Sequence, residues 1–123
     1  MDRIAFEALA DAITHYTGYL EPTSPLWAAR NPFGLRPTKP EHPFDEFGNR
    51  IFRSVLDGLQ AAHFDLHIKL TGRLSPESTL TDLATAYGRK PTEAQAWAKW
   101  LKQALNDHTI SARTEIRRFI EEQ

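Results

Sequence analysis

The sequence predicts a mainly α-helical fold of about five helices, with a short β-hairpin or ordered loop after the first helix. Apolar residues recur at spacings of three and four in five segments, which is the period of an amphipathic helix. Six of the eight prolines fall between Pro22 and Pro43, where they interrupt that pattern. With 123 residues, 41% of them hydrophobic, the chain has the size and composition of a single domain spanning 1–123.

The first predicted helix covers residues 2–17, and Gly18 ends it. The prolines that follow exclude a continuous helix, so we expect no further helix before about Ser54. Segments 35–37 and 49–52 are expected to form short strands, joined by a turn at 45–48. This proline-rich region is too apolar for a solvated linker and should pack on the next helix, because it carries Trp27, Phe33, Phe44 and Phe47.

A long central helix is predicted at about 54–70, with Ser54 as its N-cap. A shorter helix follows, capped by Ser78 or Thr79 and ended by Gly88. Both predictions combine a polar cap with an apolar stripe at helical spacing, which together mark the start and the buried face of a helix.

Two more helices complete the expected fold. The first covers about 92–105, with Thr92 as its cap. The last begins at Ser111 and is expected to bury three apolar residues, Ile116, Phe119 and Ile120.

Charge and cysteine content restrict the class of function. The 15 Lys and Arg residues nearly cancel the 16 Asp and Glu residues, so the net charge of −1 provides no global attraction to nucleic acid or anionic lipid. The absence of cysteine excludes disulfides, thiolate metal sites and a cysteine nucleophile, and says little about compartment. Without a signal-like or membrane-spanning apolar run, the chain is expected to be soluble, with its localisation and oligomeric state left open.

Two local patterns are better explained by ordinary structure. His63 and His67 are four apart on the central helix, a spacing at which two imidazoles can share a metal. No third ligand is identifiable, so no metal and no cofactor is expected. Residues 80–100 have the spacing of a helix-turn-helix, but the second helix opens with Glu93, which would face phosphate. DNA binding is therefore kept only as an alternative.

The segment from Ile13 to Arg36 resembles lysozyme-like domains of phage and prophage origin, which are related to lytic transglycosylases. In that family, a first helix ending in Glu-Gly-aromatic precedes a loop of the type Arg-Asn-Asn-Asn-Pro-Gly-Asn-Leu-Arg. Gly18-Tyr19 and the run Arg30-Asn31-Pro32-Phe33-Gly34-Leu35-Arg36 match that order. The likeness continues through 48–59 and the later helices, and it covers roughly residues 5–106.

The resemblance implies a site at the end of the first helix, with one departure. The family's catalytic acid precedes the glycine, and here that position holds Thr17, whose hydroxyl cannot protonate a glycosidic oxygen at neutral pH. Glu21 lies four residues further on and is the most plausible replacement acid. Asp45 and Glu46 are candidates for a second carboxylate. Whether the chain cleaves glycan therefore stays open.

Binding depends less than cleavage on the missing acid. Flat aromatic rings suit the apolar faces of sugars, and Tyr19 and Trp27 are expected to be the exposed ones, while Phe33 and Phe47 are expected in a small core. The resemblance assigns substrate binding to Tyr19, Trp27, Arg30, Asn31 and Arg36. The resulting prediction is a lysozyme-like domain that recognises the glycan strands of peptidoglycan. The alternatives are a helix-turn-helix DNA-binding protein and a non-catalytic helical adaptor or phage structural protein.

Overall fold

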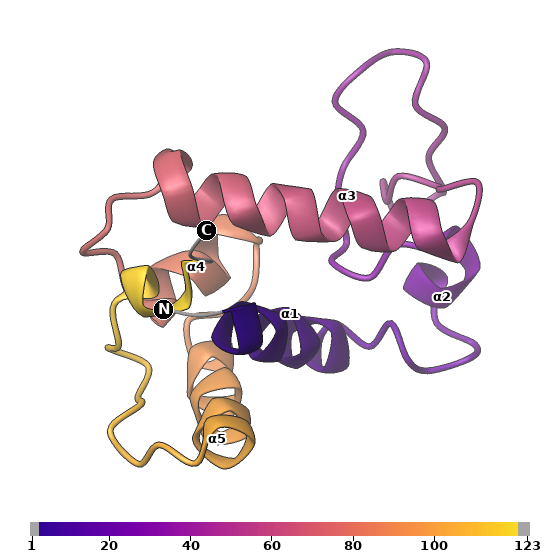
Figure 1. Ribbon diagram of the computed structural model, residues 1–123. Coiled ribbons are helices and arrows are strands. Elements are labelled where there is room, and N and C mark those ends of the chain that lie inside the picture. Colours follow the sequence, from indigo (N-terminus) through magenta and orange to yellow (C-terminus); the bar gives the residue numbers. More distant parts are fainter. Residues whose placement is uncertain (1–2, 121–123) are drawn as a thin grey trace. The chain divides into compact units, whose positions relative to one another are not determined.

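The structure, a computed structural model, describes residues 3–120 and is mainly helical, as the sequence predicts (Figure 1). The described range holds five α-helices, one π-helical segment and one 3-10 segment. Its extended pairing is limited to isolated bridges, of which one joins Phe44 to Arg50. Within residues 3–120, no helix has the length and apolar character needed to cross a bilayer.

The chain divides into two compact units. One consists of Ile13–Asp65, and the other combines the residues before and after that range. The boundaries fall within α1 (Arg3–Tyr16) and within α3 (Val55–Ile68). Every residue that the lysozyme-like resemblance assigns to the site belongs to the unit Ile13–Asp65.

Helix α2 (Pro25–Ala29) corrects the expectation that no helix would precede Ser54. Pro25 occupies the first turn, where its missing N–H leaves no helical hydrogen bond unmade. The Ser24 Oγ accepts a 3.1 Å hydrogen bond from the Trp27 N–H and so caps the helix. Arg30 ends it in the left-handed conformation, with φ 53°. Proline is unfavourable in the interior of a helix but tolerated in its first turn, so the prolines of this region do not prevent a short helix that begins at Pro25.

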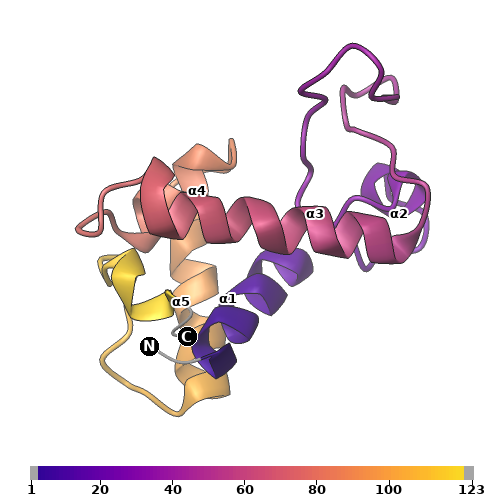
Figure 2. The same cartoon turned by 45° about the horizontal axis from the view of Figure 1, so that its top comes forward.

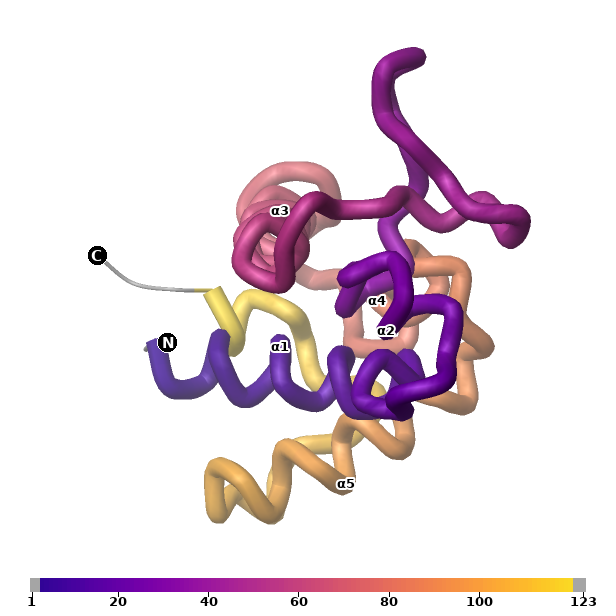
Figure 3. The backbone as a smooth tube through the Cα atoms, turned by 90° about the vertical axis from the view of Figure 1, so that its right-hand side faces the viewer, coloured from indigo at the N-terminus to yellow at the C-terminus, as the bar shows by residue number. Residues whose placement is uncertain are grey.

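The segment between α2 and α3 is an ordered loop with one turn. Gly48 donates to the Asp45 carbonyl at 3.1 Å, which confirms the turn predicted at 45–48. Arg50 donates to Leu35 at 2.9 Å and so joins the two expected strands, but the next residue, Ile51, donates to Pro43 at 2.9 Å. The pairing therefore does not continue into a ladder. Figure 3 shows this loop extending away from α2 before the chain returns to α3.

In the other unit, α4 (Leu80–Ala86) and α5 (Glu93–Leu105) form a helical hairpin (Figure 2). Thr79 caps α4 through a reciprocal pair with Asp82, which confirms one of the two predicted caps. Thr92 stands at the N-cap position of α5, as predicted, but its side chain makes no capping hydrogen bond. The two helices bury a common apolar core, which includes Leu80, Leu83, Trp97 and Leu101, each at 0% exposure.

The predicted last helix is reduced to the 3-10 segment η2 (Ile116–Phe119). The backbone that precedes it pairs elsewhere, since Leu80 donates to Thr114 at 3.1 Å and Ile116 donates to Ser78 at 2.7 Å. These bonds use the peptide groups that a helix beginning at Ser111 would need. Ile116 and Phe119 are nevertheless buried as predicted, and η2 contacts the π-helical segment η1 (Lys69–Arg73).

Candidate functional site

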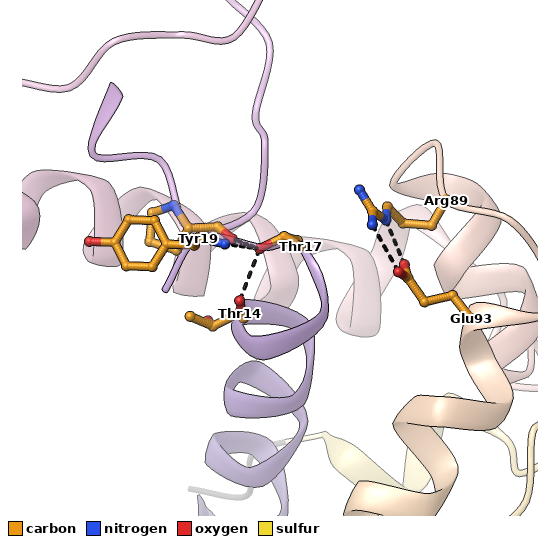
Figure 4. A network of polar contacts seen from close by, with 6 residues as sticks. Thr14, Thr17, Tyr19, Arg89 and Glu93 are labelled. Atoms are coloured by element: carbon orange, nitrogen blue, oxygen red, sulfur yellow. Dashed lines mark hydrogen bonds and ion pairs between the residues drawn. The ribbon is translucent and has the colours of Figure 1, made fainter. Parts of the chain in front are cut away.

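The side chain of Thr17, where the resemblance predicts a catalytic acid, makes its hydrogen bonds with the backbone. The Oγ1 lies 2.7 Å from the Pro32 carbonyl oxygen and 3.0 Å from the Thr14 carbonyl oxygen, and it accepts from the Tyr19 N–H at 3.4 Å (Figure 4). A hydroxyl has one proton, so it donates to one carbonyl at a time. Thr17 thus fastens the end of α1 to the loop after α2.

Glu21, the proposed replacement acid, lies in a tight turn at the surface. Its N–H donates to Gly18 at 3.1 Å and its carbonyl accepts from Ser24 at 2.9 Å, while the side chain is exposed. An acid that keeps its proton at neutral pH needs burial or a neighbouring negative charge. The surroundings of Glu21 provide no burial.

The carboxylate of Asp45 makes its hydrogen bonds with the turn at 45–48 and with its neighbour Asn49, and so stabilises that turn. Its carboxylate accepts from the backbone N–H groups of Phe47 and Asn49, both at 2.9 Å. Partial burial alone would raise the pKa of Asp45, but the hydrogen bonds from Asn49 and Phe47 outweigh it and hold the pKa below its usual value. Asp45 is therefore ionised at neutral pH and has no proton to donate. Glu46 is exposed on the same turn.

The two expected sugar-facing rings differ in exposure. Trp27 is 47% exposed, whereas Tyr19 is only 7% exposed, so the prediction that Tyr19 is open to solvent is wrong. The ring centroids lie 6.2 Å apart at an interplanar angle of 43°, and Tyr19 therefore supports the Trp27 indole from the protein side. Phe33 is buried as expected, but Phe47 is exposed rather than part of a core.

Asn31 is fully buried and all its side-chain contacts go to backbone. Its Nδ2 donates to the carbonyls of Leu35 at 2.9 Å and Arg50 at 3.0 Å, and its Oδ1 accepts from the Leu35 N–H at 2.9 Å. With 0% exposure, the side chain touches no solvent. Asn31, expected to bind substrate directly, instead holds the loop in shape.

The arginines of the same loop also contact backbone. The Arg30 Nη1 lies 3.5 Å from the Phe52 carbonyl oxygen, and the Arg36 Nη1 donates to the Phe47 carbonyl at 2.5 Å. Both side chains are exposed, so each combines a structural contact with a solvent-facing positive charge. Of the five predicted binding residues, Trp27, Arg30 and Arg36 are accessible to a ligand.

Comparison with known proteins assigns no family or function to the chain. No protein family, curated protein or solved structure matches the chain. The lysozyme-like resemblance therefore stays a prediction.

The metal and DNA-binding patterns gain no support from the described residues. No group of three or more His, Cys, Asp or Glu side chains suited to a metal occurs within residues 3–120. In the α4–α5 hairpin, Glu93 forms a bidentate ion pair with Arg89, with N···O distances of 2.5 and 2.8 Å (Figure 4). This pair neutralises the turn arginine that a DNA-binding hairpin would direct at phosphate.

One feature of the unit Ile13–Asp65 was missed by the sequence reasoning. Arg50 and Phe52 line a groove of about 540 Å³ together with the first turns of α3. The two residues are separated by one position, and in an extended segment such residues share a face. That alternation was available in the sequence, but it indicated only a strand.

Proposed function

We propose that this chain binds the glycan strands of peptidoglycan through the unit Ile13–Asp65 and does not cleave them. The observation that carries the proposal is the exposed Trp27 indole on α2, supported by the buried Tyr19 ring. A flat aromatic face that is half open and fixed in place suits the C–H face of a pyranose ring. The proline and serine at the start of α2 fix the helix that carries this indole.

Arg30 and Arg36 are the charged candidates for further ligand contacts in this unit. Both belong to the loop that follows α2, and both guanidinium groups contact backbone carbonyls while staying exposed. Guanidinium donors suit the hydroxyl and acetamido oxygens of amino sugars, so the loop can add hydrogen bonds to the apolar contact that Trp27 supplies.

Binding without cleavage follows from the state of the carboxylates. Glycosidic cleavage needs a carboxyl that holds its proton at working pH. None of the six Asp and Glu residues between positions 13 and 65 is buried. Thr17 carries a hydroxyl at the family's acid position, and that hydroxyl is committed to backbone.

A pull-down with insoluble purified peptidoglycan tests the proposal. The natural chain is expected to co-sediment, and Trp27→Ala should weaken binding by about fivefold to tenfold, the loss expected from one aromatic contact. Phe64→Ala is the matched control, because Phe64 is an aromatic side chain of the same unit that is 65% exposed. Phe64→Ala should bind like the natural chain.

Two results would contradict the proposal. Equal retention of the Trp27 and Phe64 variants would remove Trp27 from glycan recognition. Release of soluble fragments by the natural chain would show that the protein is an enzyme, and loss of that release in Glu21→Gln would then identify Glu21 as its acid.

A further inference from the structure

The groove beside the first turns of α3 combines apolar walls with four side chains that can donate hydrogen bonds. It has a volume of about 540 Å³ and lies within the unit Ile13–Asp65. Apolar walls come from Ile51, Phe52 and Ala61. The polar side chains are His42, Arg50, Arg53, Asp57 and Gln60.

Arg50 is the central cation of this groove. Its Cζ lies 4.5 Å from the centroid of the Phe52 ring, and Phe52 is only 5% exposed. The guanidinium is thus held on a rigid aromatic surface, which limits the entropy lost when it binds a ligand. Its Nε is buried and makes no hydrogen bond with the described residues. A ligand oxygen cannot reach this buried atom, so the two Nη groups are the donors that Arg50 can offer to a ligand.

The remaining polar side chains also favour an anion. Arg53 brings a second guanidinium, and Asp57 is the one carboxylate of the lining, so the groove keeps a net positive charge of one. The Nδ1 of His42 accepts from the Thr38 N–H at 3.2 Å, which in the neutral imidazole leaves the proton on Nε2. His42 therefore contributes a donor as well.

We propose that this groove binds a carboxylate attached to a short aliphatic group. Two carboxylate oxygens match the fork of a guanidinium, and a single negative charge matches the net charge of the lining. The apolar walls accept methyl and methylene groups. The identity of the ligand rests on the function proposed above: it is a free carboxylate of the peptides attached to the glycan. The groove then binds the peptide, and Trp27 contacts the sugar.

A titration of the full chain followed by amide chemical shifts tests this site. The probe is N-acetylmuramoyl-L-alanyl-D-isoglutamine, which carries one free carboxylate, and the reference is its neutral amide. Shifts are expected to saturate and to concentrate at Arg50, Phe52 and Gln60. The acid should bind at least about tenfold more tightly than the amide, because only the acid forms charge-assisted hydrogen bonds.

Two variants that each remove one positive charge distinguish binding in the groove from a general effect of net charge. Arg53→Gln should weaken the acid by roughly threefold to tenfold, whereas Arg73→Gln, which removes an exposed arginine of the other unit, should not. Asp57→Asn should tighten binding, because it removes the like charge. Arg50→Gln should abolish the preference for the acid, and the Arg53 and Asp57 variants keep the test decisive if Arg50→Gln fails to fold.

Several outcomes would overturn the inference. Equal affinity for acid and amide, equal effects of the Arg53 and Arg73 variants, or equally tight binding of inorganic phosphate would each exclude a carboxylate site. If the groove fails these tests while Trp27→Ala still weakens the pull-down, only the carboxylate site is lost. If the pull-down fails while the acid binds the groove, the carboxylate site is supported and the glycan function is lost.

Discussion

The carbonyl oxygen of Arg30 lies 1.9 Å from the point that a Cβ on Gly58 would occupy. The loop after α2 therefore packs directly on the backbone of α3, and only a glycine admits it at this distance. The Arg30 carbonyl carbon and the Pro32 Cδ lie at 3.0 and 3.3 Å from the same point, so backbone atoms form most of the contact. The predicted packing of the proline-rich region on the central helix depends on this position.

Gly58→Ala should destabilise the protein, although alanine is the better helix former by about 1 kcal/mol. The added methyl would displace backbone, and overpacking of this kind costs about 1–3 kcal/mol. We expect the free energy of unfolding in urea to fall by about 2 kcal/mol. Gly72→Ala is the control, because no atom lies within 4 Å of its Cβ position. Equal stability of the two variants would show that the loop does not pack on α3 in this way.

Asn31→Ala should cost more than a surface substitution. It removes two donors and one acceptor that serve the Leu35 and Arg50 backbone, and at about 1 kcal/mol for each bond the loss is about 3 kcal/mol. The measurement is again the unfolding free energy. Gln95→Ala, an exposed amide on α5, should leave it nearly unchanged, and a similar value for both variants would contradict the role of Asn31.

Thr17→Glu should make stability depend on pH. The carboxyl would replace a hydroxyl that lies near two carbonyl oxygens, so the protonated form is favoured and its pKa rises above the value of about 4.3 in peptides. A raised pKa means that the folded state holds the proton more tightly than the unfolded state. The free energy of unfolding of Thr17→Glu should therefore decrease as pH rises from about 4 to 7, whereas Thr17→Gln should show no such trend.

The same variant tests whether the lysozyme-like resemblance extends to chemistry. A carboxyl with a raised pKa is what an acid catalyst requires, so Thr17→Glu should release more soluble fragments from peptidoglycan than the natural chain. The rate should stay low, because the groups that orient a catalytic carboxyl have no reason to be present. Retained release in the double variant Thr17→Glu, Glu21→Gln would assign it to position 17. No release from either variant would leave the resemblance without chemical support.

Asp107 should contribute stability only where it is ionised. Hydrogen bonds from the Thr109 hydroxyl, the Arg118 guanidinium and the Thr109 N–H hold its pKa far below the usual range. Such a depressed pKa gives stability that is complete above about pH 4, the unfolded value, and is lost as pH falls through the folded pKa. Asp107→Asn should lower the urea midpoint at pH 7 and converge with the natural chain in strong acid. Glu46→Gln, on an exposed turn, should have little effect at either pH.

Features that depend on neighbours in sequence were predictable. The Thr79 cap needs only an aspartate three residues later, and Gly18 and Gly88 have the positive φ that their helix-ending roles require. The structure confirms these, and with them the helical fold class. Thr92 stands at the predicted N-cap position of α5 but makes no capping hydrogen bond, because its backbone is helical and not in the extended conformation that a cap adopts.

Features that depend on distant partners were not predictable. The carbonyl that Asn31 reaches at Arg50 is 19 positions away, and the segment after Ser111 pairs with residues near Thr79. Tyr19 and Phe47 exchanged their expected exposure, because burial depends on what covers a ring and not on the ring itself. The groove around Arg50 was missed for the same reason, since the first turns of α3 complete it.

The buried Asn31 also has a consequence for the chemical ageing of the protein. Asparagine usually deamidates when the nitrogen of the next peptide group attacks its side chain and closes a succinimide ring. The next residue is Pro32, whose nitrogen carries no hydrogen, so this ring cannot form in the usual way. Conversion of Asn31 to aspartate would place a negative charge against the carbonyl oxygens of Leu35 and Arg50. Pro32 blocks the usual route of that conversion. Pro32 therefore protects the hydrogen bonds of Asn31 from loss through deamidation.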